Sequence, residues 1–161
     1  MCARRIALDI LMDIEEQKSY SNISIRKHLD NKKITHLDKK LITGLVYGVL
    51  ENKIYLDFII DKLSKTRISR IDKEVLLILR MGLYQIVYLD RVPAFAIVNE
   101  SVELAKEVNY KASGFVNGLL RNFLRKQKRI KLLPSRENPV RYLSVLYSYP
   151  EWLVDKWIKQ L

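Results

Sequence analysis

The residues whose types and spacing could do chemistry in this sequence are mainly basic. Six cations stand between positions 121 and 131 with no acidic residue among them: Arg121, Arg125, Lys126, Lys128, Arg129 and Lys131. On a helix, Arg121, Arg125 and Lys128 project from one side, because they are spaced i, i+4 and i+7. Like charges this close repel one another unless an anion lies near. The dipole at the C-terminal end of a helix favours cations, which explains the basic residues of the last turn. It explains Arg121 less well.

A second basic cluster, Arg4 and Arg5, stands at the start of the chain. Alone, the two arginines could be a solubilising terminus. Together with Tyr20, whose ring can stack on a base, they form a candidate site for the phosphates and bases of single-stranded RNA. The sequence therefore predicts six RNA-binding residues: Arg4, Arg5, Tyr20, Arg121, Arg125 and Lys128.

No side chains have the spacing of a catalytic or metal centre. His28 and His36 fall in separate predicted elements, with no cysteine or paired acid at metal-ligand spacing, so surface or helix-capping roles are expected. Cys2 has no base near it in sequence, and there is no glycine-rich phosphate loop with a strand before it. We therefore expect this chain to be no enzyme itself, with no catalytic, metal or cofactor-binding residues.

The charge balance agrees with a nucleic-acid partner. Lys and Arg number 29 against 18 Asp and Glu, a formal net charge of +11. Excess positive charge attracts polyanions, because each neutralised phosphate releases condensed counterions. An acidic membrane surface is the competing partner, and a solvated basic surface with no partner is the third interpretation.

A reducing, cytoplasmic location is expected. The single cysteine can form no internal disulfide. The N-terminus lacks the apolar core of a signal peptide. The most apolar stretch, 75–89, is interrupted by Arg80 and is too short to span a bilayer, so no membrane partner is expected.

The apolar residues recur with helical period along nearly the whole chain, which predicts an all-α bundle of about seven helices with a C-terminal helical extension. The segment 71–89 is apolar on most faces, so it is predicted to be the central helix. In the helix that Thr35 is expected to cap, the predicted inward stripe is Leu37, Leu41, Leu45 and Val49. Gly44 and Gly48 lie four apart there and are expected to let another helix approach closely.

The C-terminal part is predicted to differ from the rest. Pro134, Asn138 and Pro139 indicate a break, and a final amphipathic piece follows Pro150. Trp152 and Trp157 in that piece are expected either to pack back on the bundle or to mark where a larger protein was cut. The predicted division is an RNA-binding domain at 1–132 and, at 133–161, a linker with the start of a segment leading to a further domain.

Two segments resemble a known family. Met-Gly-Leu-Tyr-Gln at 81–85 leads through Val92 and Pro93 into Ala-Ile-Val-Asn-Glu-Ser-Val-Glu-Leu-Ala-Lys at 96–106, and Phe-Val-Asn-Gly-Leu-Leu-Arg-Asn-Phe follows at 115–123. This order is similar to the antitermination-factor NusB fold family, and the resemblance extends from about Ala3 to Arg129. It implies an all-helical RNA-binding fold in which the N-terminal arginines contact RNA. Asn99, Glu100 and Asn117 are expected to tie helices together, since polar residues at packed positions need partners, and direct RNA contact is the alternative.

The family has two branches. One is the free antitermination factor, which binds a boxA RNA together with a small ribosomal protein. The other is the N-terminal domain of the 16S rRNA cytosine-C5 methyltransferases of the RsmB (Sun/Fmu) type. Gly-Leu-Tyr-Gln at 82–85, Leu-Leu-Arg-Asn-Phe at 119–123 and the tail at 149–157 resemble the second branch. His usually precedes the proline of that tail, so Tyr149 is a departure.

The resemblance implies a domain that positions 16S rRNA for an S-adenosylmethionine-dependent methyltransferase. The catalytic domain of that family supplies two cysteines and a Rossmann-like sheet, which are absent from this chain. S-adenosylmethionine is therefore expected only in that domain, which would be the chain's own C-terminal partner. Two alternatives stay open: a free NusB-type transcription antitermination factor, and a helical protein-interaction module that would lack salt-sensitive RNA binding.

Overall fold

All regular structure in the described part of the chain is helical. The computed structural model describes residues 2–17, 21–30, 33–127 and 136–160, and no strand occurs in these ranges. Its α-helices are α1 (Ala3–Gln17), α2 (Ser21–Leu29), α3 (His36–Glu51), α4 (Lys53–Leu63), α5 (Lys73–Tyr88), α6 (Ala94–Val108), α7 (Ser113–Lys126), α8 (Pro139–Tyr147) and α9 (Glu151–Lys159). Two short 3-10 turns, η1 (Ile68–Arg70) and η2 (Tyr110–Ala112), precede α5 and α7. The predicted seven-helix all-α bundle with a C-terminal helical extension is confirmed.

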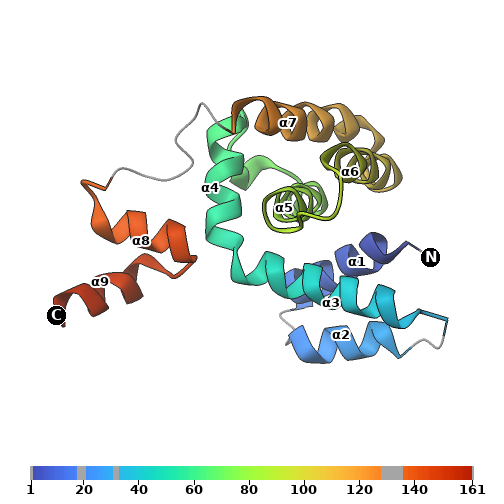
Figure 1. Cartoon of the computed structure of the whole chain (residues 1–161), viewed down its shortest axis with the longest axis horizontal. Coiled ribbons are helices and arrows are strands. Elements are labelled where there is room, and N and C mark those ends of the chain that lie inside the picture. Colours follow the sequence, from blue (N-terminus) through green and yellow to red (C-terminus); the bar gives the residue numbers. More distant parts are fainter. Residues whose placement is uncertain (1, 18–20, 31–32, 128–135, 161) are drawn as a thin grey trace.

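Helix α5 is the centre of the bundle. Figure 1 shows it nearly end-on, with α1 and α3 on one side, α6 and α7 on the other, and α4 beside it. Residues 75–83 are all buried, so the helix has almost no solvent-facing side. A helix apolar on most faces is stable only when other helices surround it, which explains why this segment takes the central place. The prediction of a central helix at 71–89 is confirmed.

One charged side chain lies inside this core. Arg80 of α5 is 5% exposed. Its Nε and Nη2 donate hydrogen bonds of 2.7 and 2.9 Å to the two carboxylate oxygens of Asp57 in α4. Its Nη1 also lies 3.5 Å from a carboxylate oxygen of Glu15 in α1. A buried guanidinium needs such partners, so this network fixes α5 against α4 and α1.

The start of α3 confirms one prediction and corrects another. The Thr35 side chain accepts a 3.1 Å hydrogen bond from the backbone N–H of Asp38, as the cap predicts. Leu37, however, is 77% exposed, so its place in the inward stripe was wrong. Residues spaced strictly by four advance by about 40° per step around a helix of 3.6 residues per turn, so Leu37 lies about 120° away from Val49 and off the buried face. The buried face uses Ile42, Leu45, Val46 and Val49 instead.

Only one glycine of the predicted pair makes a close helix approach. A Cβ at Gly48 would lie 2.1 Å from Cζ of Tyr84 in α5, so the expected approach is confirmed there. Gly44 is exposed and a Cβ would meet no atom within 4 Å, so its predicted role was wrong. The Tyr84 ring also packs on Tyr88 with ring centroids 5.1 Å apart. Burial, followed by the neighbouring Tyr84, raises the pKa of Tyr88 above the ordinary tyrosine value.

The segment expected to be a linker contains an additional helix. Asn138 caps α8, because its side chain accepts a hydrogen bond of 3.2 Å from the backbone N–H of Arg141, and Pro139 occupies the first turn. Asparagine at the cap followed by proline is a helix start, although the same pair was interpreted as a break. The predicted boundary between residues 132 and 133 lies outside the described residues, so the domain division stays a prediction.

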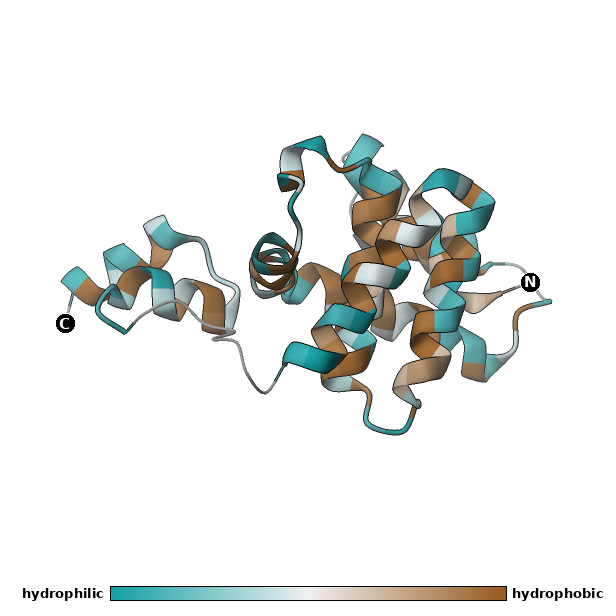
Figure 2. Cartoon of the chain, turned by 90° about the horizontal axis from the view of Figure 1, so that it is seen from above, coloured by the Kyte–Doolittle hydropathy of each residue, from teal (hydrophilic) through white to brown (hydrophobic). Residues whose placement is uncertain are grey.

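Helices α8 and α9 form a hairpin that stands beside α4 (Figures 1 and 2). The backbone N–H of Tyr55 in α4 donates a 3.2 Å hydrogen bond to Oγ of Ser148, the residue that ends α8 in the left-handed conformation. The Trp157 ring packs edge-on against Tyr149, with centroids 5.3 Å apart, and Trp152 is 69% exposed. The two tryptophans therefore do not pack back on the bundle.

Candidate nucleic-acid interface

Arg4 is held in place by a buried amide. Its Nε donates a 2.8 Å hydrogen bond to Oε1 of Gln85, which is 1% exposed and itself donates a 3.0 Å bond to the carbonyl of Met81. A guanidinium has five N–H donors, so four remain for other acceptors. No carboxylate pairs with Arg4 within the described ranges. Arg4 is thus a half-buried, pre-oriented cation with donors to spare.

Arg5 differs from its neighbour, because acidic side chains already neutralise it. Its Nε lies 3.3 Å from a carboxylate oxygen of Asp9, one turn along α1, and its Nη1 lies 3.7 Å from Glu107 of α6. The second of these pairs connects the first turn of α1 to the end of α6. A phosphate at Arg5 would have to compete with both carboxylates, so its predicted RNA contact is less favourable than that of Arg4.

The late basic residues lie on the exposed side of α7. The Nε of Arg121 donates a 2.8 Å hydrogen bond to Oδ1 of Asn117, one turn before it. Arg125 and Lys126 are exposed in the last turn. None of the three pairs with an acidic side chain in the part of the chain that is described. The predicted repulsion between like charges is therefore left without a counterion among the described residues.

The N-terminal arginines and the basic residues of α7 do not form one continuous surface. In Figure 1, α1 begins at the side of the bundle opposite to the C-terminal end of α7, which lies next to α4. Two of the predicted contacts, Tyr20 and Lys128, lie outside the described residues. The six predicted RNA-binding residues therefore stay predictions, and an RNA that used both clusters would have to cross the bundle.

Three polar residues of the family motif do not have the predicted structural role. Asn99 and Glu100 are exposed on α6, and Asn117 bonds within its own helix to Arg121. The prediction that they tie helices together was wrong, because Asn99 and Glu100 face solvent and the hydrogen bond of Asn117 stays within α7. Gln85 has that role instead. Sequence reasoning used it only to compare family branches, although a glutamine in an otherwise apolar helix needs a buried partner.

The structure also gives the surroundings of two titratable residues considered in the sequence, His28 and Cys2. His28 of α2 lies with its Nε2 2.5 Å from a carboxylate oxygen of Asp13 in α1, which connects the two helices, and Cys2 is exposed. Among the described residues, no three His, Cys, Asp or Glu side chains gather in a way that could hold a metal ion. None of the described helices is long and apolar enough to cross a membrane.

Comparison with known proteins identifies the family to which this chain belongs. A model of the NusB family matches residues 1–125. The Bacillus subtilis protein named "Probable ribosomal RNA small subunit methyltransferase B" is 37% identical over 155 residues, which is 96% of this chain and 34% of that protein. A Synechocystis protein of the same name is 37% identical over 154 residues, covering 95% of this chain and 34% of its own length. The chain thus spans about a third of these relatives.

Relatives of a second kind match a smaller part of this chain. "Transcription antitermination protein NusB" of Ruminiclostridium cellulolyticum is 41% identical over 120 residues, which is 73% of this chain and 83% of that protein. A chain in the solved structure "Crystal Structure of a Plectonemic RNA Supercoil" has a TM-score of 0.70 at 22% identity, over 81% of this chain and 100% of its own length. At that identity the likeness shows the fold alone.

Proposed function

Because the chain belongs to the NusB family, we propose that it is an RNA-binding domain that positions 16S rRNA for an S-adenosylmethionine-dependent cytosine-C5 methyltransferase domain. The observation that carries the RNA-binding part is the set of arginines that no carboxylate among the described residues neutralises. Arg4 is oriented by Gln85, and Arg121 and Arg125 project from α7. Arginines with unused donors bind phosphate oxygens in charge-assisted, often bidentate hydrogen bonds.

The extent of the matches supports the methyltransferase part of the proposal. A match of 155 of the 161 residues to the Bacillus subtilis methyltransferase has to include α8, which lies beyond the end of the family model at residue 125. The match to the Ruminiclostridium antitermination protein leaves about a quarter of the chain uncovered. In this proposal, α8 and α9 lead from the RNA-binding bundle towards the catalytic domain, which is the chain's covalent partner.

Salt dependence of RNA binding tests the arginines. We expect Arg121→Ala and Arg125→Ala each to weaken binding to 16S rRNA fragments. Each should also reduce the slope of log affinity against log salt by about 0.7–0.9, the value for one lost phosphate contact. The loss should be similar for different RNA sequences, because phosphates carry no sequence information. Filter binding at several salt concentrations measures both quantities.

Lys159→Ala is the matched control for these variants. It also removes one positive charge, but Lys159 lies in α9 and already pairs with Asp155 at 2.9 Å. We expect its salt slope to equal that of the parent protein. Unchanged slopes for both α7 variants would show that this basic stripe is only a solvated helix end. A parent protein without salt-sensitive RNA binding would contradict the proposal as a whole.

A second test concerns the cofactor. We expect no saturable binding of S-adenosylmethionine to this chain in calorimetric titration, because the proposal assigns the cofactor to the catalytic domain. Joining the chain to that domain should create a cofactor site and methylation of 16S rRNA. Micromolar binding by the isolated chain would contradict this division of roles.

A free antitermination factor is the second candidate function. It is favoured by the 41% identity to the Ruminiclostridium protein, most of whose length is matched. Determining the downstream gene sequence separates the two candidates. A frame that continues into two cysteines and a glycine-rich strand-to-helix turn would support the methyltransferase, whereas a stop codon directly after residue 161 would support the free factor.

A further inference from the structure

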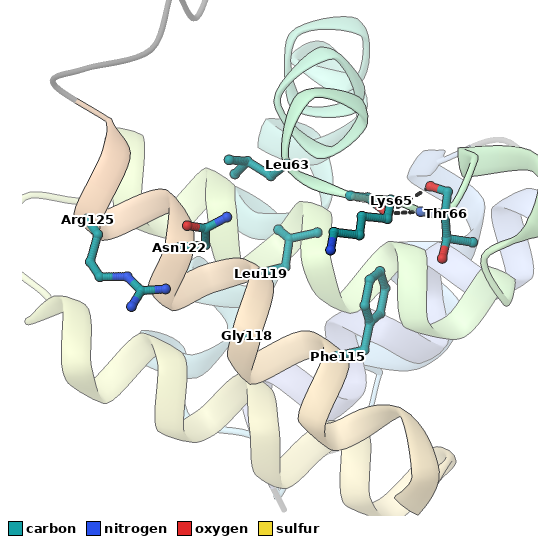
Figure 3. A pocket seen from close by; sticks show the side chains of 9 residues that line it. Leu63, Lys65, Thr66, Phe115, Gly118, Leu119, Asn122 and Arg125 are labelled. Carbon is teal, nitrogen blue, oxygen red and sulfur yellow. Dashed lines mark hydrogen bonds between the residues drawn. The ribbon is translucent and has the colours of Figure 1, made fainter.

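A groove lies between α7 and the segment that follows α4. Its volume is about 390 Å³, which is within the range of roughly 300–1,000 Å³ for small-ligand sites. Figure 3 shows the α7 side chains in a row, with Lys65 reaching towards that helix from the opposite wall. The lining residues are Leu63, Ser64, Lys65, Thr66, Phe115, Gly118, Leu119, Asn122 and Arg125.

This groove has an apolar floor and cationic side chains at its edges. Phe115 and Leu119 provide the apolar surface, and the amide of Asn122 is half-buried among them. Lys65 and Arg125 are exposed, and neither forms an ion pair with any described residue. The loop opposite α7 is held in shape, because Oγ of Ser64 donates to the carbonyl of Thr66 (2.7 Å) and accepts from its N–H (3.0 Å).

We infer that this groove binds one unstacked nucleotide of a single-stranded RNA. The base lies against Phe115 and Leu119, its polar edge meets the amide of Asn122, and the adjoining phosphates lie between Lys65 and Arg125. Aromatic contact together with cations along the backbone is the general way in which proteins hold single strands. This inference rests on the proposed RNA-binding function and names a contact that the N-terminal arginines do not provide.

RNA fits this groove better than an acidic peptide does, because the positive charge continues beyond it. Arg125 belongs both to the groove and to the exposed α7 stripe with Arg121. A phosphate chain that leaves the groove can therefore follow the stripe, with one cation per helical turn. A short acidic peptide would need no such continuation.

Two glycines of α7 allow a test that leaves the fold intact. A Cβ at Gly118 or at Gly114 would meet no atom within 4 Å, and both positions are exposed. Gly118 lines the groove, whereas Gly114, one turn earlier, does not. A leucine at position 118 therefore starts from open space at its Cβ and projects from the groove lining, and Gly114→Leu adds the same side chain outside the groove. Both changes replace a helical glycine, so neither should lower the thermal stability.

The experiment measures the affinity of the full chain for a short single-stranded RNA by fluorescence anisotropy. We expect Gly118→Leu to weaken binding by about fivefold or more, the loss that one base contact produces, and Gly114→Leu to bind like the parent. Lys65→Ala should reduce the salt slope by about 0.7, the single-strand value for one phosphate. A 4-thiouridine in the RNA should crosslink to the α7 peptide that contains Phe115, and Gly118→Leu should abolish this crosslink.

The outcomes distinguish a failure of the groove inference from a failure of the proposed RNA-binding function. If the parent binds RNA and Arg121→Ala weakens it, but Gly118→Leu binds as well as Gly114→Leu, the groove inference is overturned and the proposed function stands. If the parent shows no salt-sensitive RNA binding, both are overturned. Binding of an acidic peptide that Gly118→Leu blocks, with RNA affinity unchanged, would assign the groove to a protein partner and also overturn the inference.

Discussion

Replacing Asp57 by alanine is expected to lower the free energy of unfolding by about 3–5 kcal/mol, the usual cost of removing one partner of a buried ion pair. Arg80 would keep its charge inside the core, where Glu15, at 3.5 Å, is its remaining ion-pair partner among the described residues. Glu15 cannot replace Asp57, because Asp57 accepts two parallel hydrogen bonds from the guanidinium, of 2.7 and 2.9 Å. Chemical denaturation followed by circular dichroism measures this loss.

Two further variants make the result specific. Glu151→Ala removes the carboxylate from an exposed pair, Arg141 with Glu151 at 3.1 Å, and should cost at most about 1 kcal/mol. The double variant Asp57→Leu with Arg80→Met replaces the buried pair by apolar groups and should recover most of the loss. If Asp57→Ala costs no more than Glu151→Ala, the buried network does not fix α5 in the way described.

The helical scaffold could be predicted because its determinants are local. A helix requires apolar residues at a period of 3.6 and suitable residues at its ends, and both can be recognised within one segment. The central helix follows from its apolar residues on every face, and the start of α3 follows from Thr35. Helix α8 was missed although the same kind of information was present, since Asn138 and Pro139 were interpreted as turn residues rather than as a cap and a first helical residue.

The candidate site could be predicted only in part, because its geometry depends on residues far apart in the chain. The charge of Arg4 was enough to predict it as an RNA contact, but the amide that orients it comes from Gln85, 81 positions later. The groove needs Lys65 and Arg125 from opposite walls, and no periodicity connects two such segments. Helical phase decides whether a polar residue packs or faces water, and for Asn99 the sequence pattern alone did not determine that phase.

The contact between Gly48 and Tyr84 has a consequence that a double-mutant cycle can measure. A side chain at position 48 would begin 2.1 Å from the Tyr84 ring, so the ring has to move. The movement breaks its packing on Tyr88, whose ring centroid is 5.1 Å away. We therefore expect Gly48→Leu to destabilise the protein by about 1–3 kcal/mol, the cost of overpacking, although leucine favours a helix more than glycine does.

Gly44→Leu is the matched control, because Gly44 lies one turn earlier in α3 and a Cβ there meets nothing within 4 Å. It should gain up to about 1 kcal/mol from helix propensity alone. With Tyr84→Ala the obstacle at position 48 is absent, so Gly48→Leu should lose most of its cost in that background. The resulting coupling energy should be about 0.5–3 kcal/mol. Equal effects of Gly48→Leu with and without the tyrosine ring, measured by thermal melts, would show that Tyr84 is not what limits residue size at position 48.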